Sequence, residues 1–590
     1  APFSGSRSGE GRGRNRPVSL PGRIIRFASR RAARRFDDAA RRTAGLQRDL
    51  QSRLMTTNAD TEYGRSYGFG SISDVVAVQR QVPVVAYEDI ADDMTRVTEG
   101  ARGVFTAEEP VMFSQTSGTT GAPKFIPITP SSQRGAHADQ MRTWMAHALR
   151  DHPTIFDGKV ISLVSPAVEG YTPSGLAFGS TSGHIYKHMP AIMRRAYAIP
   201  YEVFEISDYQ AKYYALMRIG LEHDVRFAAT ANPSSILKMC EKADELSETI
   251  IADIRDGTLS QDFSIEGEIR EELRALFKPN RGRAKALEAM RSSREGRLLP
   301  GDYWPRLALI GCWKGGTVGH YLGRFDAWFN PDGGTTPVRD WGFLASEGRM
   351  SIPLSDKGSK GALTVASNFF EFVPTADVDA APDDPTRWTG LTADQVEIGA
   401  EYYVLITTAD GLYRYDINDI VRVEDRYREA PEIVFLRKGR GMTNLTGEKV
   451  SVNQVIETFQ HASRATGAIA DHFKAEADVE HSRYVFRVEF GNRVDVGLRK
   501  RFLGELDRHL QDINLEYQAK RNSQRLGQPV LHVMREGWYE RGRRRQVAGG
   551  ARAFQAKTEL LSADKLRTRF IRPELDSVVE LDPEDGPIPR

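Results

Sequence analysis

The stretch that decides the fold runs Thr116-Ser117-Gly118-Thr119-Thr120-Gly121-Ala122-Pro123-Lys124, with strand-forming residues on both sides of it. Glycine lets a backbone approach an anion closely, and successive N–H groups in such a turn form a concave anion site. The hydroxyl groups add donors and Lys124 adds positive charge. The sequence therefore predicts a phosphate-binding loop. It is not a Walker loop, because the stretch lacks the Gly-x-x-x-x-Gly-Lys-Ser/Thr pattern.

The composition is that of a globular protein with more than one domain. At 590 residues a single core is unlikely to suffice, so two or more domains are expected. The net charge of +2 comes from 81 basic and 79 acidic residues, a balance that argues against a dedicated nucleic-acid binder. The two cysteines form no disulfide framework, which favours a reducing cytoplasm. No apolar run is long enough to span a bilayer, so we do not expect a membrane partner. Because the charges are balanced, we do not expect a nucleic-acid partner either.

The order of segments along the chain predicts an α/β fold. Residues 1–22 are rich in Gly, Ser, Arg and Pro and predict a disordered basic arm. From residue 23 to residue 54 apolar residues recur at helical spacing among arginines, which predicts one long amphipathic helix. Its arginines are compatible with a membrane surface, but its alanine-rich apolar face favours packing on the main domain. Strands then alternate with helices, which predicts mostly parallel sheets flanked by helices.

The domain limits follow from the same reading. Residues 23–436 are expected to form a large N-terminal domain, and residues 437–441 a glycine-containing hinge. Residues 442–570 predict a smaller, mobile α+β domain, and residues 571–590 an acidic, proline-containing tail. Ligands of parallel sheets bind beyond the carboxyl ends of strands, where the loop at 116–124 and the Gly315–Gly316 turn both fall.

Three further segments, taken with the loop, resemble one family. They are Pro-Val-Val-Ala-Tyr-Glu-Asp-Ile at 83–90, Phe-Phe-Glu-Phe-Val-Pro at 369–374 and Gly-Leu-Tyr-Arg-Tyr-Asp-Ile-Asn-Asp-Ile-Val at 411–421. The loop resembles that of the adenylate-forming superfamily, and the combination resembles its auxin-responsive acyl acid amido synthetases. The resemblance extends from about residue 70 to about residue 560, and the chain is identified as a bacterial-type member.

The resemblance implies a nucleotide site around the motif at 341–348. Phe343 takes the place of the aromatic residue that stacks on adenine, and Ser346 and Glu347 follow it in the family pattern. Glu347 is the expected ligand of a Mg²⁺ ion that bridges the phosphates of ATP. A triphosphate needs such an ion, and Mg²⁺ is usually held by one or two carboxylates together with phosphate oxygens.

The resemblance also assigns residues later in the chain. Asp419 is expected to bind the ribose hydroxyls, because a carboxylate accepts hydrogen bonds from two neighbouring O–H groups. Asn418 stands where the family has Gly, and Asn tolerates positive φ better than most residues. Lys438 is the basic residue expected to face the nucleotide. Lys557, in a Gln-x-Lys element, corresponds to the superfamily's C-terminal catalytic lysine.

The implied activity is that of an ATP- and Mg²⁺-dependent ligase. A small carboxylic acid would be activated as acyl-AMP and transferred to an amine, expected to be an amino acid, to give an amide. Lys124, Glu347 and Lys557 are the expected catalytic residues, and the turn at 313–321 is expected to line the acyl pocket. The nucleotide-binding loop residues are Thr116, Ser117, Gly118, Thr119, Thr120 and Gly121. An acyl-CoA synthetase and a catalytically silent ATP-binding homologue are the alternatives, and the sequence leaves the acid, the amine and the oligomeric state open.

Overall fold

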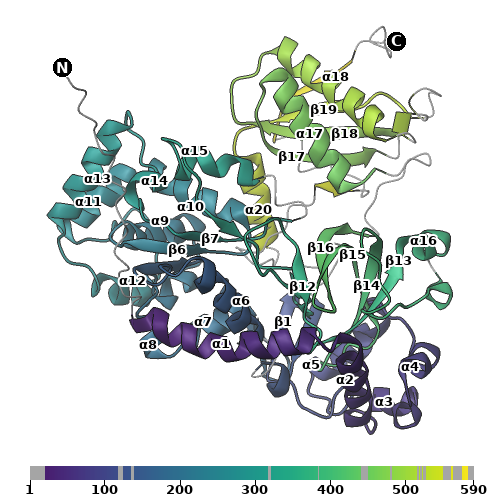
Figure 1. Ribbon diagram of the computed structural model, residues 1–590. Coiled ribbons are helices and arrows are strands. Elements are labelled where there is room, and N and C mark those ends of the chain that lie inside the picture. The colour runs from purple at the N-terminus through teal and green to yellow at the C-terminus, as the bar shows by residue number, and fades with distance from the viewer. Residues whose placement is uncertain are drawn as a thin grey trace, which may run out of the picture.

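The structure is a computed structural model. It describes residues 20–116, 124–133, 138–315, 321–382, 384–439, 450–478, 481–514, 517–518, 521, 526–548, 560–562 and 574–581. A large N-terminal part carries a smaller C-terminal domain, which lies above it in Figure 1. The predicted α/β class and the division into a large and a small domain are thereby confirmed. No helix within the described ranges is long and apolar enough to cross a membrane.

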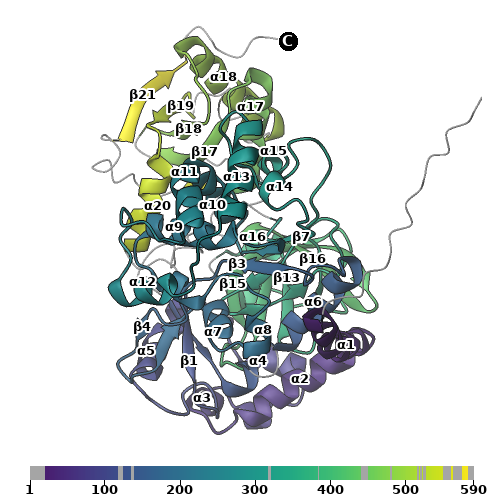
Figure 2. The ribbon, with the colours of Figure 1, turned by 90° about the vertical axis from the view of Figure 1, so that its left-hand side faces the viewer.

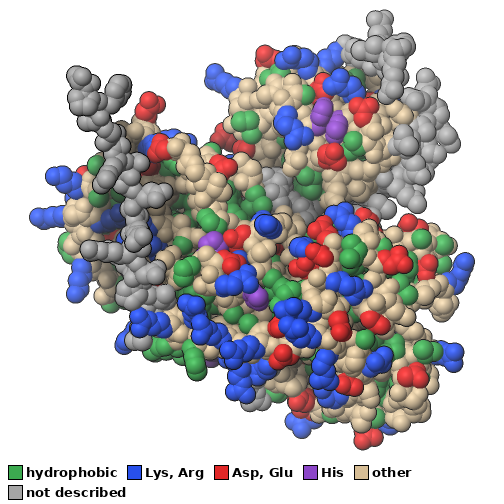
Figure 3. Space-filling model, viewed as in Figure 1, with side chains coloured by type: hydrophobic (Ala, Val, Ile, Leu, Met, Phe, Trp, Pro, Cys, Tyr) green, Lys and Arg blue, Asp and Glu red, His purple; other side chains and the backbone are tan. Residues whose placement is uncertain are grey.

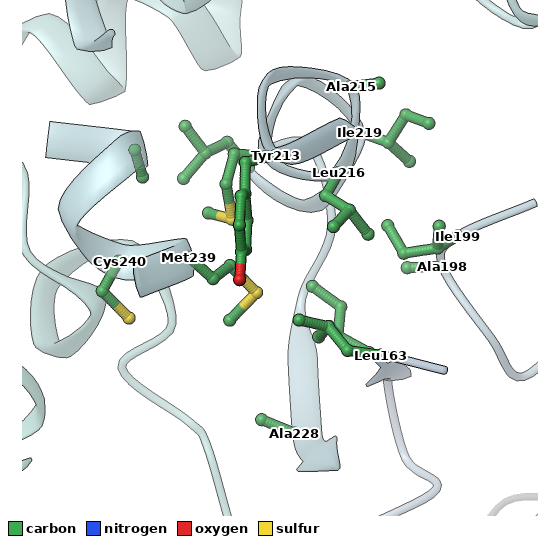
Figure 4. Close-up of a cluster of buried hydrophobic side chains, with 14 of the residues drawn as sticks. Leu163, Ala198, Ile199, Tyr213, Ala215, Leu216, Ile219, Ala228, Met239 and Cys240 are labelled. Atoms are coloured by element: carbon green, nitrogen blue, oxygen red, sulfur yellow. The ribbon is translucent and has the colours of Figure 1, made fainter. Parts of the chain in front are cut away.

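One sheet of the N-terminal part is parallel and has helices on both faces. Its strands, in spatial order, are β3 (Lys159–Ser162), β6 (Val225–Ala229), β7 (Leu309–Gly311) and β8 (Val338–Arg339). Because side chains alternate along a strand, Phe227 packs in the same core as Trp144 of α6 (Ala138–Asp151), whereas Ala228 belongs to the opposite core. Figure 4 shows that opposite core, where Leu216 and Ile219 of α9 (Tyr209–Gly220) lie near Leu163 and Ala228.

A second sheet carries the predicted phosphate loop. Its order is β2 (Lys124–Ile128), β1 (Met112–Thr116), β5 (Ala177–Gly179) and β4 (Gly170–Tyr171), and it mixes parallel and antiparallel pairs. The expectation of mostly parallel sheets therefore holds for the first sheet only.

The third sheet is antiparallel throughout. Its strands, in spatial order, are β11 (Ser351–Ile352), β12 (Gly361–Leu363), β16 (Ala430–Lys438), β15 (Tyr415–Tyr427), β14 (Glu401–Thr407) and β13 (Phe369–Pro374). The central strands are buried on both faces, for example at all residues of β14 after the first. Such continuous burial produces the unbroken apolar runs that are also typical of parallel strands, which explains the wrong prediction of direction.

The predicted long N-terminal helix is two helices. The first, α1 (Leu20–Ala40), begins within the predicted disordered arm, because Pro21 is tolerated in a first helical turn. The second, α2 (Thr43–Thr57), follows a break at Arg42, which has φ −135°. Ile25 of α1 packs in the core beneath α6, whereas Leu50 of α2 packs against the antiparallel sheet. The break allows α1 and α2 to pack in two different hydrophobic cores.

The C-terminal domain is a five-stranded sheet covered on one face by two helices. Its order is β20 (Leu561–Ser562), β17 (Ala470–Asp478), β18 (Arg483–Phe490), β19 (Val530–Met534) and β21 (Leu575–Glu580). The helices are α17 (Val452–Thr466) and α18 (Val496–Ile513), and the helical spacing of apolar residues in the sequence predicts them at 452–465 and 496–512. The predicted acidic tail is wrong at its start, since β21 pairs antiparallel with β19 and belongs to this sheet.

The two domains contact one another through a helix and a few polar groups. Helix α20 (Trp538–Ala548) lies beside α9 and α10 (Pro233–Glu245) in Figures 1 and 2. The Tyr321 hydroxyl lies 3.4 Å from Nδ1 of His472, and that imidazole stacks on Tyr539 of α20 at 3.9 Å. The C-terminal domain is thus held against the parallel-sheet half of the N-terminal part.

Candidate active site

The predicted phosphate loop connects the two strands of an antiparallel hairpin. Thr116 at the end of β1 and Lys124 at the start of β2 are direct cross-strand partners. The loop between them, with the predicted binding residues Ser117, Gly118, Thr119, Thr120 and Gly121, lies outside the described residues. Both ends of the loop are therefore fixed by strand pairing, as the strand-loop-strand pattern predicted.

Lys124 has two partners in the segment at 82–90. Its Nζ lies 2.8 Å from Oε1 of Glu88 and 5.1 Å from the ring centroid of Tyr87. The Tyr87 hydroxyl accepts a 2.9 Å hydrogen bond from the backbone N–H of Phe125, the residue after Lys124. Burial raises the pKa of Tyr87 above its ordinary value, so this hydroxyl stays neutral. In the sequence Tyr87 and Glu88 contribute only to the family resemblance, whereas in the structure they contact Lys124 and the strand that follows it.

A buried ion pair anchors that segment to the antiparallel sheet. The Arg414 guanidinium donates to both carboxylate oxygens of Glu371 and to the carbonyls of Gln79 and Val82. Glu371 is the acidic residue of the Phe-Glu-Phe strand β13, and both side chains are almost fully buried. The motifs at 369–374 and 411–421 are thus two halves of one contact, which no spacing in the sequence indicated.

Glu347 lies at the tip of a short hairpin. Strands β9 (Leu344–Ala345) and β10 (Gly348–Arg349) pair antiparallel, and Ser346 and Glu347 form the turn, both half-buried. Gly348 has φ +152°, and a Cβ there would lie 3.0 Å from the amide nitrogen of Asn368. Glycine is therefore needed immediately after the glutamate.

The charges of Glu347 and Glu88 both act on the buried hydroxyl of Tyr415. Burial raises the pKa of the Tyr415 hydroxyl well above its ordinary range, and the charges of Glu347 and Glu88 raise it further. Both carboxylates therefore lie within electrostatic reach of one buried phenol, and Glu88 in turn binds Lys124. Lys124 and Glu347, which are predicted from separate motifs, are brought to the same region of the molecule.

Phe343, the residue predicted to stack on adenine, is almost fully buried in the structure. Its ring stacks on Phe435 of β16 with centroids 5.5 Å apart, and only 8% of the residue is exposed. The preceding Gly342 has φ +86°, and a Cβ there would lie 2.3 Å from the carbonyl oxygen of Ser351. One face of the ring is therefore occupied by Phe435, and the residue belongs to the buried core of this part of the molecule.

Asp419 lies on β15 directly opposite Lys438 of β16. The aspartate is buried, and the preceding Asn418 has φ +52°, as expected for the residue that replaces glycine in this turn. Asn418 donates from its backbone N–H to the Asp416 carboxylate at 2.7 Å and accepts from the N–H of Gly439 at 2.9 Å. The structure thus places the predicted ribose-binding residue beside the predicted basic residue.

A buried carboxylate joins the two turns that follow β7 and β8. Asp340 accepts hydrogen bonds from the backbone N–H groups of Lys314 and Gly342. Burial raises the pKa of Asp340 to about 6, although these N–H groups lower it. The expected acyl-pocket turn and the start of the motif at 341–348 are therefore held by the same side chain, and no motif in the sequence indicates this link.

Two predicted elements cannot be placed. Lys557 lies outside the described residues, as does the second part of the predicted hinge, residues 440–441. Of the hinge glycines, Gly439 is described, and a Cβ there would lie 2.0 Å from the Tyr403 ring. Close packing against an aromatic ring therefore requires this glycine, whatever its part in a hinge.

The site residues fit a magnesium triphosphate. Among the described residues there is no group of three or more His, Cys, Asp or Glu side chains able to hold a metal alone. Glu347 is nevertheless a half-buried carboxylate in a turn, and one such ligand fits Mg²⁺, which in ATP sites takes its other ligands from phosphate and water.

The chain belongs to the GH3 family. The family's N-terminal domain matches residues 32–333, its central domain residues 361–438 and its C-terminal domain residues 451–566. The central domain coincides with most of the antiparallel sheet, and the C-terminal domain with the five-stranded sheet except β21, together with its helices. The family resemblance found in the sequence is thereby confirmed.

Similar proteins extend over nearly the whole chain. A jasmonoyl–L-amino acid synthetase, JAR6, of Nicotiana attenuata is 23% identical over 90% of this chain and 93% of its own length. An indole-3-acetic acid-amido synthetase, GH3.10, of Arabidopsis thaliana is 24% identical over 88% and 93%. Among solved structures, a GH3.15 acyl acid amido synthetase superposes with a TM-score of 0.80 at 19% identity, covering 92% of this chain and 96% of that one.

Proposed function

We propose that this chain is an ATP-dependent acyl acid amido synthetase that joins a small carboxylic acid to an amino acid. The observation that carries the proposal is the ion pair of Lys124 with Glu88, in a segment that the buried Arg414–Glu371 pair holds against the antiparallel sheet. Family membership supports it, and so do the relatives named above, whose names describe the conjugation of acids to amino acids.

In the first step a carboxylate oxygen of the acid attacks the α-phosphorus of ATP. The bond from that phosphorus to the pyrophosphate oxygen breaks, giving acyl-AMP. Lys124 and the N–H groups of its loop would stabilise the negative charge on the phosphates. Mg²⁺ held by Glu347 would supply further charge neutralisation. Asp419 would accept hydrogen bonds from the ribose hydroxyls, while Phe343 would contact adenine.

Lys124 already makes an ion pair with Glu88, which ATP would have to replace in this step. In the structure it is paired with Glu88, whose side chain is 67% exposed, so the pair is weakened by solvent. A polyphosphate carries more charge than one carboxylate, and it therefore competes well for the lysine. Tyr87 keeps the strand after Lys124 in place during this exchange.

In the second step the amine nitrogen attacks the acyl carbonyl. The bond between the carbonyl carbon and the AMP oxygen breaks, the nitrogen loses a proton to solvent or a base, and an amide and AMP result. We propose that the domain at 442–570 turns about residues 437–441 between the steps. Lys557 would then act in the first step only. Rotation of a lid domain between half-reactions is a recognised means of completing one site at a time.

Three further assignments are proposed with this function. The use of Mg²⁺ rests on Glu347 and on the chemistry of triphosphates. A cytoplasmic location rests on the low cysteine content. The bacterial type rests on the motifs, and the identities of 23% and 24% with the two plant relatives are consistent with it.

Pyrophosphate exchange tests the proposal. The chain is incubated with ATP, Mg²⁺, labelled pyrophosphate and a panel of carboxylic acids, and acid-dependent label in ATP is expected. Mass spectrometry then follows an active acid with an amino-acid panel or with coenzyme A. Amides formed from an amino acid support the proposal. A thioester in place of an amide would indicate an acyl-CoA synthetase, and no exchange with any acid would indicate a silent ATP-binding homologue.

A further inference from the structure

The balanced net charge conceals a strong segregation along the chain. Residues 1–36 hold ten arginines and one acidic residue, whereas the other 554 residues hold 71 basic and 78 acidic ones. All ten positive charges are arginine, the side chain that pairs with phosphate through two parallel hydrogen bonds. The expectation of no membrane partner rests on the lack of a bilayer-spanning run and on the alanine-rich apolar face of the first helix, and neither takes account of the charge at this end of the chain.

Helix α1 presents four of these arginines on a single face. Its inner face, with Ile25, Ser29 and Ala32, is buried against the N-terminal part. On the outer face, Arg23 lies four residues before Phe27. Arg30, Arg31 and Arg34 lie three, four and seven residues after it. In a helix these spacings place side chains on one side, so the arginines surround the phenylalanine. Figure 3 shows basic side chains gathered over α1 on this face of the molecule.

The outward arginines differ from those that face the protein. Arg35 pairs with Asp139 of α6, and Arg41 pairs with Asp37 within the helix end. Within the described part of the chain, Arg26, Arg30 and Arg31 make no ion pair. Their charge is not used to hold the fold together.

Two large apolar side chains lie among these charges. Phe27 is 80% exposed, more than any other large apolar residue described, and Ile24, one turn before it, is 39% exposed. A row of arginines alone would suit any polyanion. Arginines around an exposed phenylalanine and isoleucine suit an interface where phosphate groups overlie hydrocarbon. The helix lies along the outside of the molecule in Figures 1 and 2, so a flat surface can reach it.

We propose that the outer face of α1 binds the surface of an anionic phospholipid membrane, with Phe27 inserted between headgroups. The arginines bind lipid phosphates, and the helix stays in the plane of the interface. The attachment is peripheral and leaves the packing of α1 on α6 unchanged. A membrane-associated enzyme would gain access to acids whose apolar bodies partition into lipid.

Co-sedimentation of the full chain with vesicles tests this proposal. Vesicles of phosphatidylcholine with phosphatidylglycerol are compared with vesicles of phosphatidylcholine alone. Binding is expected for the anionic vesicles only, and it should weaken as salt rises. Each arginine near an anionic surface contributes roughly fivefold, so R30Q/R31Q/R34Q should lower the partition coefficient about a hundredfold. F27S should lower it about tenfold, because the apolar contact is lost.

The matched control is R53Q/R281Q/R387Q, which removes three exposed arginines elsewhere on the molecule. It should bind like the unaltered chain, and all variants should keep its melting temperature. Equal binding to neutral vesicles, no binding to anionic ones, or unchanged binding by R30Q/R31Q/R34Q would overturn the proposal. Tighter binding to a polynucleotide at equal phosphate concentration, unaffected by F27S, would also overturn it and indicate a nucleic-acid surface instead.

Discussion

Glu371→Gln removes the negative charge of the buried pair with Arg414 while nearly preserving its shape. The glutamate accepts three hydrogen bonds from the guanidinium and one from the Gln79 amide. Its side chain is 1% exposed and that of Arg414 is 7% exposed. The variant leaves a buried guanidinium without a counter-charge, and breaking a buried pair in this way costs about 3–5 kcal/mol.

The cost should be measured as a loss of unfolding free energy in urea, followed by probes in the N-terminal part. Lys360→Gln is the matched control, since Lys360 binds Asp425 and Glu432 on the same sheet but is 29% exposed. That pair lies near solvent, and its loss should cost at most about 1 kcal/mol.

The same substitution should also reduce ATP binding. Arg414 holds the carbonyls of Gln79 and Val82, and therefore the segment whose Glu88 and Tyr87 position Lys124. A loss below about 1 kcal/mol for Glu371→Gln, or no difference from Lys360→Gln, would refute the reasoning that this pair anchors the site.

Four other predictions concern single residues. Glu347→Gln should lower pyrophosphate exchange by roughly 10²–10³-fold without changing the melting temperature, and normal exchange would contradict the magnesium assignment. Asp419→Ala should weaken ATP binding, measured by calorimetry, far more than acid binding; normal ATP affinity would show the ribose role to be wrong. Lys557→Ala should slow acyl-AMP formation strongly and leave amide formation from supplied acyl-AMP nearly unchanged, whereas equal effects on both would make the lysine structural. Burial raises the pKa of Asp340 from 3.8 to about 6, so the native state retains a proton that the unfolded chain loses. Stability relative to Asp340→Asn should therefore fall by about 3 kcal/mol in all as pH rises from well below about 4 to well above about 6, and a flat difference would contradict this burial.

Local patterns in the sequence were enough for elements that depend on local rules. The periodicity of 452–465 and 496–512 gave α17 and α18 to within a residue or two at each end. The strand-loop-strand pattern located the β1–β2 hairpin, and Asn418 indeed has positive φ. Each of these features is decided by residues within one or two turns of chain.

Features that depend on distant partners were not predictable. Lys124 pairs with Glu88, 36 residues away, and Arg414 with Glu371, 43 residues away. A single sequence contains no signal that joins such positions, because the pairing is created by the way the sheets come together. The direction of the third sheet and the membership of β21 were missed for the same reason, since strand pairing is a tertiary property.

Asp340 ties the turn at Lys314 to the turn at Gly342 through one carboxylate. A substitution that moved the first turn, which is expected to line the acyl pocket, would also displace the second turn and the start of the motif at 341–348 that is expected to bind the nucleotide. During divergence the acid preference of such an enzyme can therefore change most freely at walls that Asp340 does not touch. We expect natural variation in substrate range to accumulate on those walls, and the two joined turns to be inherited as a unit.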